Sequence, residues 1–487
     1  MRKLLTPRQM RDTEREYMDQ TRTPSAQLME RAARTLCDAI ADLYGADRTV
    51  YFACGPGGNG GDGYACARMY AREGGIAVAI EAAPAATPDA RLMRERAQEA
   101  GVVVTADWRG LPEPDIWVDA LFGTGLSRAP EGEAAELIER MNSDSSDVIA
   151  VDIPSGLNGR DGRAFAACVC ADITITFQRA KTGHYLGDGM DMCGDILVRD
   201  IGIPDAFLPE DAALHVNYSD VKPRRRRRNT HKGDYGRVMI IAGSRGMAGA
   251  AAICALAAMR SGAGLTTVAC PEGILNIIQT LAPCATCLPL DEENGCISDG
   301  AAQKLGRALE GADSVVIGCG IGRGCGREII RAALECGKPA VVDADALNII
   351  SADEGLKALL CERHVITPHP GEARRLLGRD MGDPMGDARD LQAMGPCVIL
   401  KGASSVLCTG KGVYISSSGC PGMAKGGSGD ALAGMLGAIM AQGVAPERAA
   451  YVASELHGLA GEAAQEEFGE RGMLATDLVE MISEVLI

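Results

Sequence analysis

The chain has 487 residues, more than the roughly 250 to 300 at which one hydrophobic core usually stops growing, so we expect two domains. Hydrophobic residues make up 46% and charged residues 23%, as in globular proteins, and no apolar run is long enough to predict a membrane span. A formal net charge of −16 argues against a nucleic-acid partner. From Met1 to Pro7 the chain meets a proline and charges before a signal-peptide core could form, which predicts a cytoplasmic protein.

The 18 cysteines are scattered along the chain, often in apolar segments such as Ile253-Cys254-Ala255. This distribution predicts reduced thiols rather than a disulfide framework. Cys284 and Cys287 have the spacing of zinc ligands, but no second pair and no paired histidines accompany them. Buried free cysteines are therefore favoured over a zinc site.

The first half of the chain alternates between helical and strand-like patterns. Ser25 to Tyr44 carries apolar residues at helical spacing, which predicts an amphipathic helix. Six short apolar runs that predict strands follow at residues 50–53, 77–80, 102–104, 116–118, 148–151 and 173–177. Strands that alternate with helices indicate an α/β domain with a mainly parallel sheet and crossover helices.

The strongest change in composition is Lys222-Pro223 followed by five arginines, Arg224 to Arg228. Mutual repulsion disfavours tight packing of such a run, so we place the domain boundary here and predict domains at residues 1–222 and 229–487. The run could also bind phosphate or nucleic acid. A solvated linker is favoured because the rest of the chain is acidic.

The second half repeats the α/β pattern. Predicted strands lie at residues 238–242, 315–317, 340–342, 364–366 and 398–400. Both domains are therefore expected to be α/β, and no motif is repeated between them.

Three motifs of the first half follow predicted strands. The first is the glycine-rich stretch Cys54 to Tyr64, which opens a helix and would let backbone N–H groups approach a phosphate. The others are Asp119-Ala120-Leu121-Phe122-Gly123-Thr124-Gly125 and Asp152-Ile153-Pro154-Ser155-Gly156. Ligands of open α/β sheets bind beyond the carboxyl ends of the strands, so the three turns can face one crevice.

These motifs resemble those of the NAD(P)H-hydrate epimerase family over roughly residues 1 to 220, which implies a Rossmann-like three-layer αβα domain. Asp152 would be catalytic, and K⁺ would be held by Asn59, Asp119 and Ser155 through oxygen atoms. Gly58 departs from the asparagine usual there. If taken singly, Asp119 and Asp152 could instead cap loops. The resemblance implies that the hydrated cofactor is bound by Gly58, Asn59, Gly60, Gly61, Asp62, Gly123, Thr124, Gly125, Leu126, Ser127, Arg128, Ala129 and Asp152.

In the second half, Gly426-Gly427-Ser428-Gly429-Asp430 opens a helix and aims free N–H groups at an anion. An aspartate there could take a proton from a hydroxyl that attacks a phosphoryl group. Asp430 could also be an ordinary acidic residue in the first turn of a helix. His369, between two prolines, could equally be a turn residue.

With Asp343-Ala344-Asp345-Ala346-Leu347-Asn348 and Thr367-Pro368-His369-Pro370-Gly371-Glu372, this motif resembles the ADP-dependent NAD(P)H-hydrate dehydratase family over residues 230 to 487. The resemblance implies a ribokinase-like α/β fold, with Mg²⁺ and with ADP as co-substrate. Cys319 and Lys425 depart from the family pattern, and Lys425 would place a cation near the nucleotide phosphates. The hydrate would contact Ala250, Gly322, His369 and catalytic Asp430, and the nucleotide would contact Lys401, Gly402, Ala403, Ser404, Ser405 and Gly429.

Together the halves predict an enzyme that epimerises the (6R) and (6S) hydrates of NADH and NADPH, called NADHX and NADPHX. It would dehydrate the (6S) form while ADP becomes AMP and phosphate. One alternative is a vitamin or sugar kinase fused to a non-catalytic nucleotide-binding domain. Another is a scaffold, since epimerase-like folds also occur in RNA-decapping assemblies. We expect small-molecule partners, no nucleic acid, no membrane, and a homo-oligomer.

Overall fold

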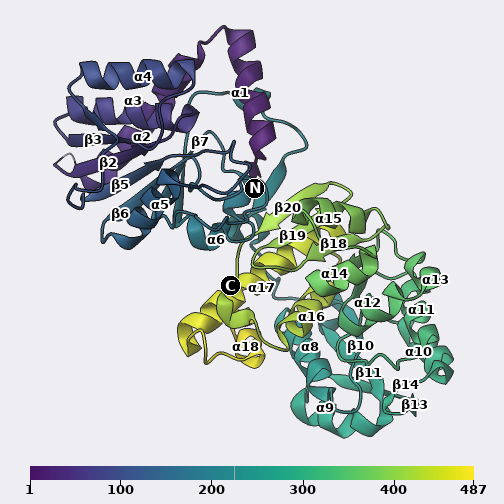
Figure 1. Cartoon of the computed structure of the whole chain (residues 1–487). Helices are drawn as coiled ribbons and strands as arrows, with labels where there is room; N and C mark the ends of the chain where they lie inside the picture. Colours follow the sequence, from purple (N-terminus) through teal and green to yellow (C-terminus); the bar gives the residue numbers. More distant parts are fainter. Residues whose placement is uncertain (46, 224, 487) are drawn as a thin grey trace. The chain divides into compact units, whose positions relative to one another are not determined.

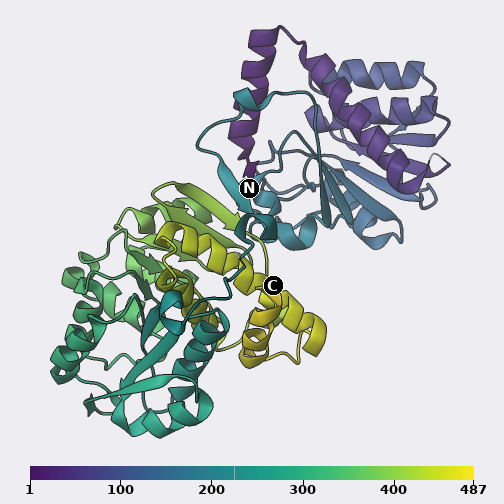
Figure 2. The same ribbon diagram turned by 180° about the vertical axis from the view of Figure 1, so that it is seen from behind.

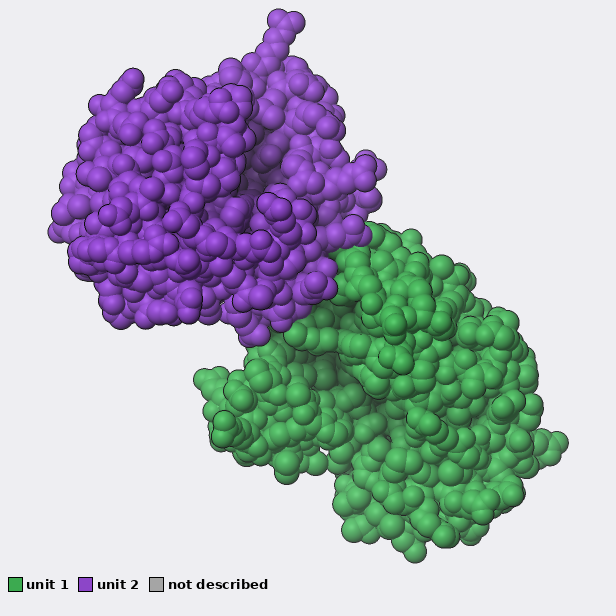
Figure 3. Space-filling model, in the orientation of Figure 1, with its two compact units in different colours: residues 1–2, 214–487 green, residues 3–213 purple. Residues whose placement is uncertain are grey.

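The computed structural model describes residues 1–45, 47–223 and 225–486. Two compact units account for them (Figure 3). Lys3–Ala213 form the N-terminal unit, and Met1–Arg2 with Leu214–Ile487 form the C-terminal unit. Within each unit, helices cover a twisted sheet (Figures 1 and 2). In the described part of the chain, no helix is both long and apolar enough to cross a membrane.

The N-terminal unit contains a parallel sheet in the order β4-β3-β2-β5-β6-β7-β8. Its strands are β2 (Thr49–Cys54), β3 (Ile76–Glu81), β4 (Val103–Thr105), β5 (Ile116–Ala120), β6 (Asp147–Val151), β7 (Ile173–Phe177) and β8 (Asp195–Arg199). Its helices are α1 (Pro7–Thr21), α2 (Ser25–Tyr44), α3 (Gly58–Arg72), α4 (Pro88–Glu99), α5 (Glu133–Ser143) and α6 (Gly189–Met192). The six strands and the helix predicted in this half are confirmed.

Alternate residues of β2 are buried on opposite faces of this sheet. Phe52 joins a core that contains Leu36 of α2 and Tyr64 of α3. Its neighbour Tyr51 joins a second core, which contains Leu137 of α5. Because successive side chains of a strand point to opposite faces, helices must cover both sides of the sheet. The predicted three-layer αβα arrangement is confirmed.

The sheet of the C-terminal unit has the order β9-β20-β19-β18-β17-β16-β15-β10-β11-β12. It is parallel except at β19, which is antiparallel to β18 and β20. Its strands are β9 (Ala213–Val216), β10 (Arg237–Ile241), β11 (Leu265–Pro271), β12 (Thr286–Leu290), β15 (Ser314–Ile317), β16 (Ala340–Val342), β17 (His364–Ile366), β18 (Cys397–Leu400), β19 (Ser405–Thr409) and β20 (Gly412–Ser416). The five strands predicted in this half are β10, β15, β16, β17 and β18.

Helices of the C-terminal unit pack on this sheet, and α16 lies directly against α8. A Cβ atom at Gly434 of α16 would lie 2.1 Å from the carbonyl oxygen of Cys254 in α8, so the absence of a side chain permits this close approach. The helices are α7 (Tyr218–Val221), α8 (Ala248–Arg260), α9 (Leu275–Leu281), α10 (Ala302–Leu309), α11 (Arg327–Glu335), α12 (Ala344–Ser351), α13 (Glu354–Lys357), α14 (Pro370–Leu377), α15 (Pro384–Gln392), α16 (Ser428–Ala441), α17 (Pro446–Phe468) and α18 (Ala475–Val485). The short strands β13 (Glu292–Glu293) and β14 (Cys296–Ile297) form a separate pair, and β1 (Arg2–Leu4) begins the chain.

The two units divide between Ala213 and Leu214, before the predicted boundary at residues 222–229. Leu214 of β9 pairs with Tyr414 of β20, and α7 packs against α17. Arg224 lies outside the described residues. Arg226 stacks on the ring of Tyr235 at 3.7 Å and donates to the carbonyl oxygen of Gly262 at 2.5 Å, so this arginine packs against the unit although the run was expected to be unpacked.

A fragment that starts at Leu214 should therefore be more stable than one that starts at Asn229. The shorter fragment lacks Val216 and Val221, which are 1% and 2% exposed. Burial of a valine contributes about 1.5 to 3 kcal/mol, so we expect the melting temperature to fall by roughly 5 °C or more. Differential scanning calorimetry of both fragments measures this, and equal melting temperatures would contradict it.

Candidate active sites

A glycine-rich turn joins β2 to the N-terminus of α3. Close packing requires glycine at two of its positions, because a Cβ atom at Gly55 would lie 1.7 Å from the carbonyl oxygen of Leu121, and one at Gly60 would lie 1.9 Å from that of Gly55. Gly57 precedes the helix and supplies no side-chain cap. The first turn of α3 therefore presents N–H groups that lack helical partners, an arrangement suited to binding phosphate.

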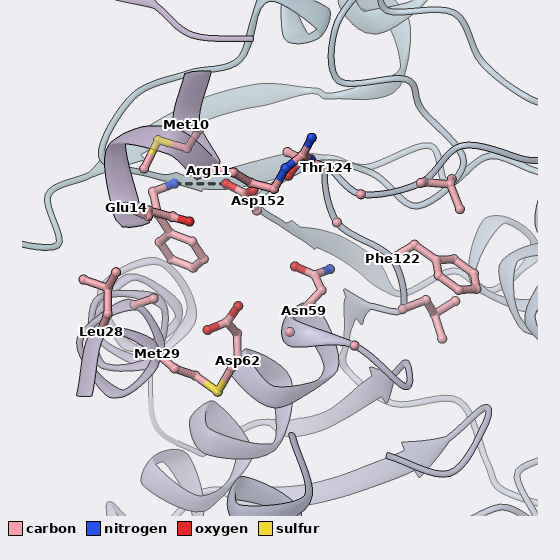
Figure 4. Close-up of a pocket in the computed structure, with 18 of the residues that line it drawn as sticks. Met10, Arg11, Glu14, Leu28, Met29, Asn59, Asp62, Phe122, Thr124 and Asp152 are labelled. Atoms are coloured by element: carbon pink, nitrogen blue, oxygen red, sulfur yellow. Dashed lines mark hydrogen bonds between the residues drawn. The ribbon is translucent and has the colours of Figure 1, made fainter. Parts of the chain in front are cut away.

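Beside this turn lies a cavity of about 570 Å³ (Figure 4). The loops after β2, β5 and β6 reach it together because these strands are neighbours in the sheet. Gly60, Gly61 and Ala129, also predicted to bind substrate, are not among the lining residues. The predicted substrate residues that line the cavity are Gly58, Asn59, Asp62, Gly123, Thr124, Gly125, Leu126, Ser127, Arg128 and Asp152. A Cβ atom built at Gly58 would have nothing within 4 Å. Packing therefore does not explain why glycine stands here in place of the asparagine that is usual in the family.

Asp119 and Ser155, two of the predicted K⁺ ligands, are bonded to each other. The Ser155 hydroxyl donates to Asp119 Oδ1 at 2.6 Å, and its backbone N–H donates to Oδ2 at 2.7 Å. Burial raises the pKa of Asp119 to about 6, although the bonds from Ser155 oppose this. The third predicted ligand, Asn59, is buried, and its Nδ2 has no hydrogen-bond partner among the described residues. Asp119 thus has the loop-capping role that its position allowed, because its carboxylate accepts from the backbone N–H groups of Leu121 and Ser155.

Asp152 follows β6 in a left-handed conformation, with φ at +65°. Its Oδ1 accepts hydrogen bonds from the Lys181 ammonium, the Thr176 hydroxyl and the Phe177 backbone N–H, the last shown as a dashed line in Figure 4. Burial alone would raise the pKa of Asp152, but the Lys181 charge and these bonds outweigh it and lower that pKa. Asp152 therefore presents a carboxylate whose ionised form is favoured at the cavity, and it also accepts from the backbone at the end of β7.

Two residues of this site, Lys181 and His184, were missed by sequence reasoning. Lys181 lies in Gln178-Arg179-Ala180-Lys181, where no glycine pattern marks a site, and its side chain is only 1% exposed. His184 Nδ1 accepts from the backbone N–H of Lys181 at 3.1 Å, so the neutral ring carries its proton on Nε2, which lies 2.9 Å from the Asp152 carbonyl oxygen. Burial lowers the pKa of His184 to about 4. The strand-end position after β7 was the one available signal.

Glu14 was also missed, together with Met10 and Arg11. All three are on α1, and all three line the cavity (Figure 4). Burial raises the pKa of Glu14 to about 7, and the nearby Asp152 charge adds to that shift. An acidic residue within an ordinary charged helix offers no signal in the sequence by which it could have been found.

In the C-terminal unit, Asp343 and Lys401 follow β16 and β18. Lys401 Nζ lies 2.9 Å from Asp343 Oδ1, and the Asp343 side chain is 2% exposed. A Cβ atom at Gly429 would lie 3.4 Å from Lys401 Nζ and 3.7 Å from Asp343 Oδ2. The start of α16 therefore lies against this ion pair, and Lys401 and Gly429, both predicted to bind nucleotide, lie side by side.

Asp430 is next along α16. Burial raises its pKa to about 6, and the Asp343 charge adds to the shift, while the Cys319 thiol and Lys401 lower it. Cys319 is fully buried. Cys319, which stands where the family usually has proline, therefore lies close enough to the predicted catalytic base to lower its pKa.

Two other predicted substrate residues, Ala250 and Gly322, lie in adjoining segments. Gly322 has φ at +77°, and its N–H donates to Asp345 Oδ2 at 2.9 Å. A Cβ atom at Gly320 would lie 2.9 Å from the Cβ of Ala250. The loop after β15 thus packs on the start of α8, and Asp345 joins that loop to α12.

His369 caps α14: its Nδ1 accepts from Gly371 N–H at 3.0 Å, as expected for a turn histidine. Its Nε2 lies 3.4 Å from Glu372 Oε1, and its side chain is half-exposed. Burial and the nearby Lys401 charge lower the pKa of His369. Glu372, which the sequence reasoning did not select, has its pKa raised to about 7 by burial.

The remaining predicted nucleotide residues lie where β18 turns into β19. Gly402 and Ala403 are exposed, Ser404 is buried, and Ser405 begins β19. Lys425 is engaged elsewhere, since its ammonium donates to the carbonyl oxygens of Arg471 at 2.8 Å and Met473 at 2.5 Å. These bonds do not support the phosphate contact that the sequence suggested for Lys425.

Within the described ranges, no group of three or more His, Cys, Asp or Glu side chains is arranged to hold a metal ion. All 18 cysteines are free in the structure, and ten of them are buried.

Comparison with known proteins agrees with the division into two halves. Residues 25–183 match the family model described as YjeF-related protein N-terminus, and residues 238–484 match NAD(P)H-hydrate dehydratase. The bifunctional NAD(P)H-hydrate repair enzyme Nnr of Escherichia coli is 36% identical over 98% of this chain and 92% of its own length. This chain belongs to the family of bifunctional NAD(P)H-hydrate repair enzymes. The family member from Moorella thermoacetica is 35% identical over 99% of this chain and 96% of its own length.

A solved structure supports the fold of one half of this family member. A ribokinase-like superfamily protein from Enterococcus faecalis matches 56% of this chain and 95% of its own, with a TM-score of 0.50 and 24% identity. The predicted ribokinase-like fold of the C-terminal unit is confirmed.

Replacement of Lys181 by methionine should destabilise the N-terminal unit, because Asp152 would remain buried without its positive partner. We expect the free energy of unfolding at pH 7 to fall by about 3 to 5 kcal/mol. The pKa of Asp152 is lowered from 3.8 in the folded protein, so the stability that the pair provides is present above that pH and is lost as the pH falls below it. The loss caused by Lys181→Met should therefore shrink in acid.

Urea unfolding followed by tryptophan fluorescence reports on this unit alone, because the only two tryptophans, Trp108 and Trp117, both lie in it. Arg15→Met is the matched control. Arg15 is 70% exposed and pairs with Asp12 at 2.7 Å, so its loss should cost about 1 kcal/mol or less. Equal losses in the two variants would contradict a buried-charge effect.

Proposed function

We propose that this chain repairs hydrated NADH and NADPH. The N-terminal unit, within the predicted domain of residues 1–222, interconverts the (6R) and (6S) epimers. The C-terminal unit, within residues 229–487, dehydrates the (6S) epimer while ADP becomes AMP and phosphate. The observation that carries this proposal is the 36% identity to a bifunctional repair enzyme over 98% of the chain. Each unit also holds a buried carboxylate beside a lysine, as acid-base chemistry requires.

In the N-terminal unit, the hydrated cofactor would occupy the cavity. The free N–H groups at the start of α3 would hold its phosphates, with the loop from Gly123 to Ala129 closing over them. Asp152, kept ionised by Lys181, would accept a proton near C6 of the nicotinamide ring. Gly60 and Gly61 would contribute to substrate binding through their backbone, because the absence of side chains lets this part of α3 pack closely on its neighbours.

We propose that Asn59, Asp119 and Ser155 hold a potassium ion. Asn59, Asp119 and Ser155 all offer oxygen atoms, the donors that a hard cation prefers. Asn59 also has an amide group whose Nδ2 has no partner among the described residues, so the amide can turn its oxygen toward a cation. A bound K⁺ would supply positive charge that keeps Asp119 ionised despite its burial.

In the C-terminal unit, Asp430 would remove the proton of the C6 hydroxyl as its oxygen attacks the β-phosphorus of ADP, and AMP would leave. The phosphate would then leave C6 with the bonding pair, and loss of a proton from C5 would restore the double bond. Ala250, Gly322 and His369 would contact the hydrate. Lys401, Gly402, Ala403, Ser404, Ser405 and Gly429 would hold ADP, and Mg²⁺ would enter with its phosphates.

The alternatives are not favoured. A vitamin or sugar kinase with a non-catalytic N-terminal half would not explain similarity to repair enzymes across both halves. A scaffold would not need Asp119 and Asp152, and both are present in the N-terminal unit.

We propose small-molecule partners, a cytoplasmic location and a homo-oligomer. Ile277 and Leu281 of α9, 48% and 49% exposed, offer an apolar surface for the contact between copies.

The decisive experiment supplies the purified chain with mixed hydrate epimers and ADP and follows recovery of the reduced-nicotinamide absorbance. We expect full recovery with the wild type. Asp119→Asn should recover only the (6S) fraction at the normal rate, because it removes the charge at the K⁺ site and leaves the C-terminal unit intact. Lack of any recovery would contradict the proposed function. Normal recovery of both epimers by the variant would contradict the ion site.

Asp430→Asn should lower the turnover of (6S) dehydration by about 10²- to 10⁴-fold, the usual contribution of a general base, with little change in ADP affinity. Wild-type turnover should fall as the pH drops through about 6, since burial raises the pKa of Asp430 to that value and a base must be ionised. Asp477→Asn is the matched control, because Asp477 is likewise the third residue of its helix, α18. Normal turnover by Asp430→Asn would show that Asp430 is an ordinary acidic residue in the first turn of α16 and not the catalytic base.

A further inference from the structure

Three carboxyl groups from three different elements line the cavity of the N-terminal unit. Glu14 is on α1, Asp62 is on α3, and Asp152 follows β6. In Figure 4 the carboxyl groups of Glu14 and Asp62 point into the same space as Asp152. Lys181 donates to Asp152, to the Thr176 hydroxyl at 2.9 Å and to a backbone carbonyl, so its ammonium is committed to this corner of the cavity.

The three groups differ in their tendency to hold a proton. Burial raises the pKa of Glu14 to about 7, and Asp152 adds to this, while Lys181 and Arg11 oppose it. Burial also raises the pKa of Asp62 well above its usual range, and Asp152 and Glu14 add to that shift. The pKa of Asp152 is lowered because the Lys181 charge outweighs its burial. Burial therefore favours the protonated forms of Glu14 and Asp62, whereas Lys181 favours the ionised form of Asp152.

Packing on both sides of Glu14 sets the position of α1. The Thr13 hydroxyl lies 3.4 Å from the carbonyl oxygen of Phe207, and the ring of Tyr17 packs edge-on against that of Phe207 at 5.4 Å. A capping box between Thr6 and Gln9 holds the start of the helix. Glu14 is therefore presented to the cavity by a helix anchored within its own unit. The matched family model begins at residue 25, so this helix lies outside it.

We propose that Glu14 is the proton donor of the epimerase reaction and that it works with Asp152 as the proton acceptor. The inference rests on the proposed function of this cavity. A proton donor is most effective when its pKa lies near the working pH, and burial raises the pKa of Glu14 to about 7. Two acids whose environments push their pKa values apart are the usual basis of paired acid and base roles.

The step is balanced without another reactant. Glu14 gives its proton to the C6 hydroxyl, the C6–O bond breaks with its electron pair leaving on water, and the lone pair of ring nitrogen N1 forms an N1=C6 double bond. A water molecule adds to the opposite face of C6, its proton goes to Asp152, and the double-bond pair returns to N1. One water leaves and one enters. The proton returns from Asp152 to Glu14 through solvent.

The test uses the full chain with ADP and compares NADHX enriched in the (6R) epimer with pure (6S) NADHX, after subtraction of the rate without enzyme. Glu14→Gln keeps the size of the side chain and removes its acidic proton. We expect recovery from (6R) NADHX to fall by about 10²- to 10⁴-fold, with recovery from (6S) NADHX unchanged. Glu16→Gln, on an exposed residue of the same helix, should leave both rates unchanged.

The outcomes separate the inference from the proposed function. A wild-type chain that recovers no (6R) NADHX above the uncatalysed rate would overturn the proposed function itself. If the wild-type chain recovers (6R) NADHX and Glu14→Gln recovers it equally fast, the role of Glu14 is overturned. The pH profile is an independent measurement if the variant fails to fold: wild-type kcat/KM for (6R) NADHX should decline as the pH rises above about 7, and a flat profile there would overturn the inference.

Discussion

A carboxylate that is taken out of water needs a positive partner, and this requirement organises both halves of the protein. Asp152 is joined to Lys181 in the N-terminal unit, and Asp343 is joined to Lys401 in the C-terminal unit. In each unit the two partners follow different strands of one sheet. Without the lysine the buried charge would be too costly to keep, so the pair ties the strand ends together as well as preserving an ionised group.

Other buried carboxyl groups have no lysine of their own to offset the cost of burying a negative charge. Glu14 and Asp430 lie near these pairs, but each lysine is already bonded to another carboxylate. Burial then raises their pKa values to about 7 and about 6. Each site thus places an acid whose pKa lies near neutral pH beside a carboxylate that is paired with a lysine, and such an acid can exchange its proton during a reaction.

Close backbone contacts bring helix N-termini to the same places. Gly55 lets the turn before α3 approach the loop after β5, Gly60 lets the start of α3 approach Gly55, and Gly429 at the start of α16 lies against Lys401 and Asp343. Side chains at Gly55 and Gly60 would force the turn before α3 to shift, whereas a Cβ atom at Gly429 would only just touch Lys401. The glycine-rich motifs therefore serve packing and phosphate binding together, and the two uses cannot be separated in the sequence alone.

Several features were predictable because they are local. Apolar runs identified the strands that carry the sites, and three motifs after β2, β5 and β6 converge because neighbouring parallel strands end at one edge of a sheet. Local pattern was weaker where pairing is remote. The antiparallel β19 and β20 were not predicted. The domain boundary was expected after β9, because the pairing of β9 with β20 joins residues about two hundred positions apart and leaves no local signal.

The sequence by itself determined the α/β class of both units, the order of the motifs and the family to which they belong, since each depends on short stretches of residues. Only the tertiary structure decided that Glu14 faces Asp152, that Lys181 holds Asp152 ionised, and that Lys425 is bonded to backbone carbonyls. These are properties of burial and of distance between remote segments. A proton's affinity for a carboxyl group is set by the charges and the water that surround it in space, and the order of residues along the chain does not record either.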